Sequence, residues 1–134
     1  MPKVLISDAM DGIAKKTLTS NKIDVDVKTD FNIEELKNQI LEYDGLIIRS
    51  ATKVTKEIIE SAKNLKIIGR AGAGVDNIDL VYAKEKKIIV MNTPGGNTNA
   101  TAEHSLALLM SLSRKISKAD VSTHKGEWAK KKHK

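Results

Sequence analysis

Short apolar runs that end in polar loops recur along this chain. Three of them are Val4-Leu5-Ile6, Leu46-Ile47-Ile48 and Ile88-Ile89-Val90. Continuous runs of this kind, rich in β-branched residues, are typical of strands that are buried on both faces of a parallel sheet. Helix-like segments separate the runs along the chain. This alternation predicts an α/β fold in which a parallel sheet carries helices on both faces.

Five strands and five helices are predicted. The strands cover Lys3–Ser7, Ile23–Val27, Asp44–Ile48, Lys66–Gly69 and Ile88–Met91. The helices cover Gly12–Thr19, a segment capped by Asn32 that runs through Ile40, a segment capped by Thr55, a segment capped by Asp79 that runs to about Lys86, and a long final helix from about Thr98 to about Ser122. Five such units favour a flavodoxin-like strand order, 2-1-3-4-5, with right-handed crossovers. That order places the loops after the third, fourth and fifth strands side by side.

Composition excludes several classes of protein. A chain of 134 residues without cysteine has no disulfide, no thiolate nucleophile and no Cys-based zinc site. Its three histidines lack the spacing of metal ligands, so we expect no metal. No apolar run is long enough for a membrane span and the first residues do not resemble a signal peptide, so we expect a cytoplasmic protein without a membrane partner.

The net charge of +6 comes mainly from the end of the chain. Five lysines lie in the last ten residues: Lys125, Lys130, Lys131, Lys132 and Lys134. Trp128 is the only aromatic residue near them, so a stacking platform for bases is missing. We therefore expect a solvated basic tail and no nucleic-acid partner.

Only three of the 23 basic residues are arginines, and Arg49 and Arg70 both come where a predicted strand ends. Each could pair with a surface carboxylate. However, a guanidinium group binds carboxylate or phosphate through two parallel hydrogen bonds, which a lysine cannot do. Their position on adjacent strand ends, where open α/β sheets bind ligands, favours a binding site for a small anion.

Two glycine-containing loops follow the fourth and fifth strands. Gly72-Ala73-Gly74 suggests a dinucleotide-binding turn, but the third glycine of that motif is replaced by Asn77. A loop whose backbone amides approach a small anion beside Arg70, or a turn with left-handed residues, are the alternatives. Pro94–Asn97 precedes the last helix, where Asn97 can cap the helix, bind an anion, or do both.

Three further features bear on the site and on the packing of the chain. Asp8 ends the first strand and either caps the first helix or lines the crevice. His104 follows Glu103, but adjacent helical residues point in different directions, which favours a structural histidine over an acid–base pair. The final helix is apolar over much of its surface, so it should pack against another domain or subunit.

Four segments together resemble the D-isomer-specific 2-hydroxyacid dehydrogenase family: Leu46–Thr55, Gly69–Asp79, Val90–Asn97 and the basic stretch Gly126–Lys132. The resemblance covers nearly the whole chain in register. It implies an NAD-dependent oxidoreductase that acts on a CH–OH group. The Arg49–Val54 segment favours a phosphorylated substrate, 3-phosphoglycerate, over glyoxylate or lactate.

The resemblance also implies roles for particular residues. Those that match substrate-binding positions are Arg49, Ser50, Arg70, Gly72, Asn97 and Lys130, the last reaching the phosphate from a partner subunit. Lysine keeps the charge of the arginine often found there but loses its fork. Ala73 matches a position that touches the cofactor, NAD, although alanine lacks the hydroxyl of the usual threonine.

The family's organisation implies two parts in this chain. Residues 1–97 correspond to the substrate-binding (catalytic) domain. Residues 98–134 correspond to a linking and dimerisation helix, with a homodimer formed through 98–122, and to a basic tail that leads into a nucleotide-binding domain. None of the family's catalytic residues has a counterpart, so we expect an N-terminal fragment that is inactive alone. A free-standing small-anion binding module, or a fragment of another D-2-hydroxyacid dehydrogenase, are the alternatives.

Overall fold

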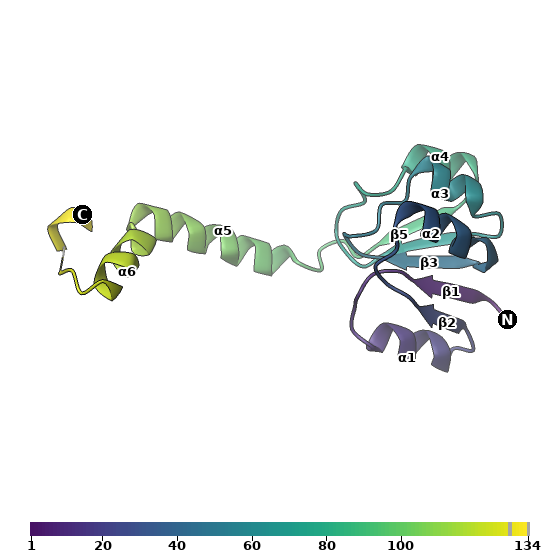
Figure 1. Cartoon of the computed structure of the whole chain (residues 1–134), viewed down its shortest axis with the longest axis horizontal. Coiled ribbons are helices and arrows are strands. Elements are labelled where there is room, and N and C mark those ends of the chain that lie inside the picture. Colours follow the sequence, from purple (N-terminus) through teal and green to yellow (C-terminus); the bar gives the residue numbers. More distant parts are fainter. Residues whose placement is uncertain (129, 134) are drawn as a thin grey trace. The chain divides into compact units, whose positions relative to one another are not determined.

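Five parallel strands form one sheet in the order β2-β1-β3-β4-β5 (Figure 1). Their bounds are β1 Lys3–Ile6, β2 Asp24–Val27, β3 Gly45–Ile48, β4 Ile67–Arg70 and β5 Ile89–Asn92. This computed structural model describes residues 1–128 and 130–133, without the side chains of 130 and 133. The flavodoxin-like order and all five strands predicted from the sequence are confirmed, each within one residue at either end.

The chain divides into two compact units, Met1–Gly96 and Asn97–Lys134. The first unit holds the sheet and four α-helices, and the second holds the remaining helices. The helices of the first unit are α1 Ile13–Ser20, α2 Ile33–Gln39, α3 Lys56–Ser61 and α4 Leu80–Glu85, with a short 3₁₀ turn η1 at Ile40–Glu42.

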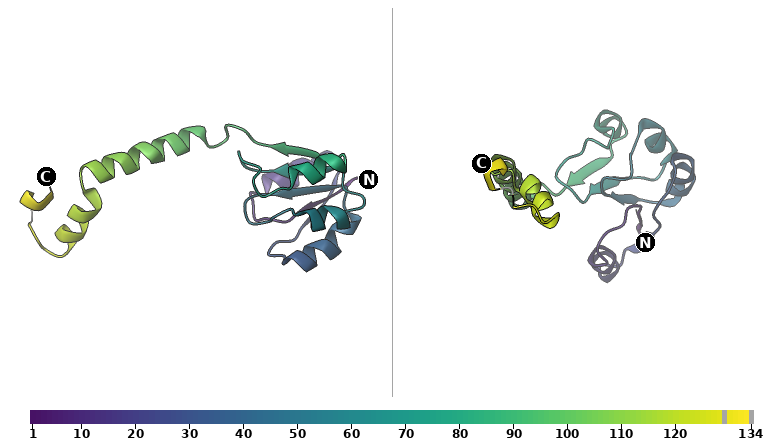
Figure 2. Two further views of the ribbon diagram at one scale, coloured as in Figure 1. Left: turned by 90° about the horizontal axis from the view of Figure 1, so that it is seen from above. Right: turned by 60° about the vertical axis from the view of Figure 1, so that its left-hand side comes forward.

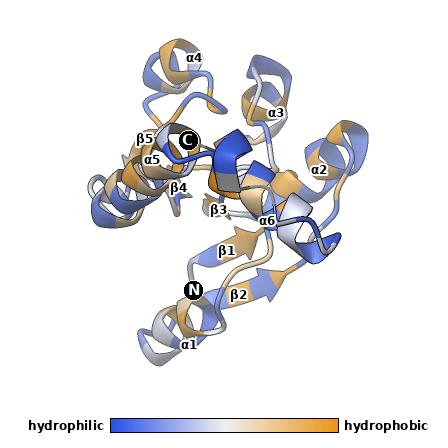
Figure 3. Cartoon of the chain, turned by 90° about the vertical axis from the view of Figure 1, so that its left-hand side faces the viewer, coloured by the Kyte–Doolittle hydropathy of each residue, from blue (hydrophilic) through white to orange (hydrophobic). Residues whose placement is uncertain are grey.

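Helices lie on both faces of the sheet, as predicted, but they are unevenly shared. Helices α2, α3 and α4 cover one face, and α1 lies on the other face beside β2 (Figures 2 and 3). Helix α1 covers only the β2 end of its side of the sheet. The rest of that side, formed by β3, β4 and β5, therefore carries an open apolar hollow of about 410 Å³. Ile47, Ile67 and Met91 line this hollow, and Met91 is 56% exposed.

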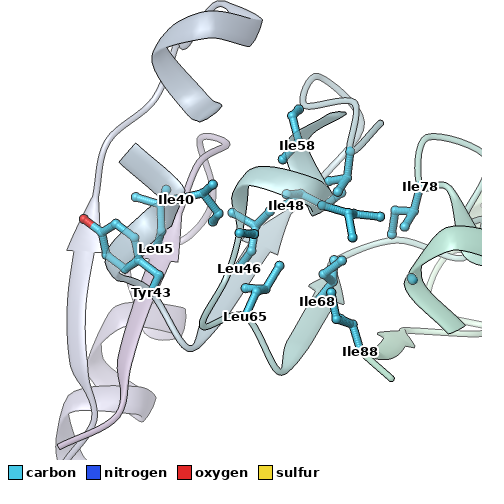
Figure 4. Close-up of a cluster of buried hydrophobic side chains, with 14 of the residues drawn as sticks. Leu5, Ile40, Tyr43, Leu46, Ile48, Ile58, Leu65, Ile68, Ile78 and Ile88 are labelled. Carbon is cyan, nitrogen blue, oxygen red and sulfur yellow. The ribbon is translucent and has the colours of Figure 1, made fainter. Parts of the chain in front are cut away.

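The hydrophobic core lies between the sheet and helices α2 to α4. Leu5, Leu46 and Ile68 point from adjacent strands towards Ile40 and Ile58, and all five are fully buried (Figure 4). Each of these strands therefore presents alternate residues to the core, as the pleat of a strand requires. Burial of these side chains is the main force that holds the strand ends, and the loops that follow them, in place.

The ends of three helices show how the predicted caps are used. Asn32 and Glu35 form a reciprocal capping box at α2, and Asp79 accepts from the Tyr82 amide at α4. Thr55 stands at the N-cap position of α3, but its side chain makes no capping bond. The predicted caps at Asn32 and Asp79 are therefore confirmed. At Thr55 the predicted start of the helix is confirmed, but the cap is not.

The second unit differs from the single long helix that the sequence predicted. It contains α5 Thr98–Ser113, α6 Ile116–His124 and a 3₁₀ segment η2 at Lys130–His133. The chain leaves the helix at Arg114 and turns through Lys115, which takes a left-handed conformation with φ 51°. Just before this break, the Met110 carbonyl oxygen accepts both from the Ser113 hydroxyl and from the Arg114 amide, each at 3.0 Å.

Among the residues that the structure describes, no helix has the length and apolar character needed to cross a bilayer.

Candidate anion-binding site

A cleft of about 320 Å³ opens at the carboxyl ends of β1, β2 and β3. Three loops line it, through Ser7, Asp8, Ala9, Thr29, Asp30, Phe31, Arg49, Ser50, Ala51 and Thr52. The order β2-β1-β3 makes the gap between β1 and β3 the point where the chain's crossovers change direction. Open α/β sheets bind their ligands at this point, so the cleft is the candidate site.

Arg49 and Ser50 are the residues of this cleft that suit an anion. Both are exposed and follow directly after β3. The Arg49 guanidinium donates from Nη1 to the carbonyl oxygen of Ala9, another residue that lines the cleft, at 3.1 Å. A guanidinium group has five N–H donors in all, so most of this fork can serve a ligand.

Of the two roles that the sequence suggested for Asp8, lining the cleft is found and capping α1 is not. The residue is only 6% exposed, and its carboxylate is already bonded to the protein. The carboxylate accepts from the Arg49 amide at 2.5 Å, from the Thr52 amide at 3.1 Å and from the Thr52 hydroxyl at 2.6 Å. Asp8 therefore holds the loop that carries Arg49 and Ser50.

Asn77 is a residue of the site that sequence analysis missed. Its side-chain amide donates to the Arg49 carbonyl oxygen at 2.8 Å and to the Thr52 carbonyl oxygen at 2.7 Å. A parallel bridge between Val54 and Ile78 brings the two segments together. In the sequence, Asn77 stood out only as a substitute for glycine, and nothing there signals contacts to a loop 25 residues away.

Arg70 lies next to this loop but not in the cleft. It is the last residue of β4 and pairs with Ile48 across the sheet, and its side chain is only 12% exposed. Its Nε donates to the Arg49 carbonyl oxygen at 3.3 Å, and its Nη1 donates to the Gly74 carbonyl oxygen. The two arginines are thus neighbours, as predicted, but the Arg70 fork is turned onto its own loop.

The glycines after β4 accommodate this guanidinium. A Cβ at Gly72 would stand 3.1 Å from Arg70 Nη1, and a Cβ at Gly74 would stand 3.1 Å from the same atom. Ala73 between them is exposed, and its carbonyl oxygen accepts from the Asn92 amide at 2.7 Å. A close approach of the guanidinium to the backbone therefore explains the Gly-Ala-Gly sequence without a dinucleotide.

The remaining predicted residues lie in the second unit. Asn97 occupies the N-cap position of α5 but makes no capping bond through its side chain, so the predicted cap is right in position only. The side chain of Lys130 lies outside the described residues. His104 and Glu103 are both exposed on α5, and no group of three His, Asp or Glu side chains in the described residues could hold a metal ion.

The fold and the cleft define a class of protein: a flavodoxin-like α/β domain that presents an arginine and a serine at the switch point of its sheet. The model of the D-isomer-specific 2-hydroxyacid dehydrogenase catalytic domain matches residues 4–129, and the chain belongs to this family.

Curated relatives place the chain close to one member of the family. It is 48% identical over 130 residues to D-3-phosphoglycerate dehydrogenase of Archaeoglobus fulgidus, which covers 97% of this chain and 25% of that protein. It is 45% identical over 130 residues to the human protein of the same name, again with 97% of this chain covered and 24% of the relative. The chain thus spans about a quarter of the length of these relatives.

Solved structures also resemble this chain in sequence and fold. A protein of Pyrococcus horikoshii OT3 superimposes with a TM-score of 0.80 at 38% identity, over 96% of this chain and 38% of the other. The NAD⁺-bound 3-phosphoglycerate dehydrogenase of Entamoeba histolytica gives a TM-score of 0.73 at 33% identity, over 82% and 38%.

Proposed function

We propose that this chain is the substrate-binding part of an NAD-dependent D-3-phosphoglycerate dehydrogenase. That enzyme oxidises 3-phosphoglycerate to 3-phosphohydroxypyruvate in the first step of serine biosynthesis. The relatives at 45–48% identity carry this name, and the observation that supports it in the molecule is the Arg49-Ser50 pair in the lining of the switch-point cleft. A doubly charged phosphate and a carboxylate are the anions that such a pair suits.

In this proposal the chain contributes binding and orientation. The Arg49 fork and the Ser50 hydroxyl receive one anionic end of the substrate. Arg70, Gly72, Asn97 and Lys130 remain the further proposed contacts, and Arg70 would have to exchange its bond to Gly74 for a ligand oxygen. Contacts of this kind fix the position of the reacting carbon, and such positioning can account for a large part of an enzyme's rate enhancement.

The described residues do not form a dinucleotide site. The Gly72–Gly74 loop lies against Arg70, and the next helix, α4, begins only at Leu80 and is six residues long. A pyrophosphate cradle needs a helix that starts directly from the glycine turn. The exposed Ala73 remains a proposed point of contact with NAD.

A titration of the isotope-labelled 134-residue chain with 3-phosphoglycerate tests the substrate. We expect shifts of the amide signals of the Arg49–Thr52 loop, and a loss of affinity of about tenfold or more in Arg49→Ala, since a charge-assisted hydrogen bond contributes about 1.5–3 kcal/mol. Arg114→Ala, which removes the same side chain between α5 and α6, is the matched control. Equal affinities of the wild type and Arg49→Ala would contradict the proposal.

We further propose that the second unit is the linking and dimerisation segment, and that α5 pairs with its copy in a homodimer. Leucines in the second half of α5 support this, since Leu106, Leu108, Leu109 and Leu112 are 58–79% exposed. An exposed apolar surface of this kind marks a contact with another protein surface.

A further inference from the structure

We infer that Asp8 and Asn77 are positioning residues, which hold the main chain of Arg49–Thr52 from two sides so that the Arg49 guanidinium and the Ser50 hydroxyl face the cleft. This inference rests on the proposed substrate site and adds the residues that shape it. Neither residue is proposed to touch the substrate.

The peptide groups of Arg49 are held by side chains from two distant segments. Its N–H donates to the Asp8 carboxylate, after β1, at 2.5 Å. Its carbonyl oxygen accepts from the Asn77 amide, before α4, at 2.8 Å. A residue whose N–H and C=O are both bonded in this way cannot rotate either peptide plane without breaking a bond, and so the direction of its side chain is restricted.

The other end of the loop is held by the same two residues. The Thr52 amide and hydroxyl donate to Asp8, and the Thr52 carbonyl oxygen accepts from Asn77 at 2.7 Å. Ser7 is a buried residue, and its Oγ lies 3.0 Å from Thr52 Oγ1 and completes the network. Asp8 and Asn77 thus brace both ends of a four-residue loop, between which Ser50 and Ala51 are exposed.

The side chain of Asn77 is suited to this role through its donors. Both of its bonds are donated to main-chain carbonyl oxygens, whereas its buried Oδ1 has no hydrogen-bond partner in the described part of the chain. An unpaired buried acceptor costs free energy. The amide therefore contributes to this loop through its two donors, which hold two carbonyl oxygens in a fixed geometry.

The test compares Asn77→Ala with Asn64→Ala in the full 134-residue chain. Asn64 offers a matched control, because its amide also donates to a main-chain carbonyl oxygen in a remote segment, that of Leu41 at 2.9 Å. Two quantities are measured: the amide signals and hydrogen exchange of Arg49–Thr52 without ligand, and the affinity for 3-phosphoglycerate. Thr52→Val and Thr52→Ser examine the Asp8 side, since only serine retains the hydroxyl.

We expect Asn77→Ala and Thr52→Val to displace or broaden the loop signals, to speed their exchange, and to weaken 3-phosphoglycerate binding by about tenfold through lost orientation. Asn64→Ala should leave both readouts within about twofold of wild type, and Thr52→Ser should restore them. Loop signals and affinity in Asn77→Ala that match those of Asn64→Ala would overturn the inference.

The two readouts separate this inference from the proposed substrate. A wild-type chain that does not respond to 3-phosphoglycerate would overturn the substrate proposal. The claim that Asp8 and Asn77 help to position this substrate would fall with it. The ligand-free signals still decide whether the brace exists: an undisturbed loop in Asn77→Ala shows that it does not.

Discussion

At the scale of single residues, the sheet contains two glycines with different surroundings. A Cβ at Gly45, in β3, would lie 3.0 Å from Val4 Cγ2 and 3.2 Å from Ile67 Cγ2, so the side chains of the strands on either side would have to shift to admit it. A Cβ at Gly69, in β4, would meet only Ile47 Cγ1 at an ordinary 3.7 Å. The size of an added side chain should therefore affect stability at Gly45. At Gly69 only the loss of glycine's backbone freedom should affect it.

We expect Gly45→Ala to destabilise the chain by about 1–3 kcal/mol, the usual cost of overpacking. Gly69→Ala should be neutral or stabilising by up to about 1 kcal/mol, because alanine loses less backbone entropy in a strand. Denaturant unfolding of both variants, with Gly12→Ala as a control where nothing lies within 4 Å of the added Cβ, gives the comparison. Similar midpoints for Gly45→Ala and Gly69→Ala would contradict this account.

Residues of the site differ in how far the sequence could predict them. A rare arginine at a strand end is a local signal that makes Arg49 a candidate, and the match to the family's substrate-binding positions makes Ser50 one. Asp8 could be noticed but not assigned, and Asn77 was missed, because their partners are main-chain atoms of a remote loop. Bonds from a side chain to the backbone of another segment leave no pattern in a single sequence, since any residue can supply the backbone.

At the scale of elements, a hydrogen-bonded cluster ties edge strand β2 to the turn η1. The hydroxyl of Tyr43, which is 2% exposed, donates to the Asp26 carboxylate at 2.7 Å, and Lys3 Nζ lies 3.4 Å from the same oxygen. The bond from Tyr43, with a smaller contribution from Lys3, lowers the pKa of Asp26 below its ordinary value. Burial, together with Asp26, raises the pKa of Tyr43.

These shifts set the pH dependence of stability. A carboxyl group whose pKa is lowered on folding stabilises the fold above its unfolded-state pKa of about 4, and this contribution is lost as pH falls through the lower folded-state value. Tyr43→Phe removes the largest cause of the shift at Asp26, so we expect a shallower loss of stability on acidification. A tyrosine whose pKa is raised stabilises the fold below about pH 10, and the variant removes this alkaline dependence too.

Unfolding midpoints measured from about pH 2 to pH 7 check the acid limb. Tyr82→Phe, which removes another tyrosine-to-carboxylate bond, from Tyr82 to Glu60 at 2.8 Å, is the matched variant. If the curves of Tyr43→Phe and of the wild type stayed parallel over this range, the bond to Asp26 would not contribute to the pH dependence.

The sequence predicted the elements of the first unit better than those of the second. Strands such as Leu46-Ile47-Ile48 and capping residues such as Asn32 carry local signals, and both were confirmed. No glycine or proline marks the break between α5 and α6 in the sequence. The left-handed position there is taken by Lys115, a residue type that does not signal a turn. The open apolar hollow over β3 to β5 was also not predicted, since a buried and an uncovered apolar face look alike in sequence.

At the scale of the whole molecule, α5 has no buried residue in the described chain although it is rich in leucine. Apolar side chains occur all round it, so no single orientation of this helix would place them all away from water. We therefore expect the wild-type chain to associate into a dimer or a larger species through α5.

Light scattering during size-exclusion chromatography, over a range of protein concentrations, tests this association. Leu106→Glu combined with Leu109→Glu places two charges one helical turn apart on α5, and burying unpaired charges in an apolar interface is unfavourable enough to shift the chain towards monomer. Ile13→Glu is the control, because Ile13 is also an exposed apolar helix residue, 67% exposed, but lies on α1 in the first unit. A wild-type chain that stays monomeric at high concentration would refute pairing through α5. If Ile13→Glu made the chain monomeric and the double variant did not, the contact would lie in the first unit instead.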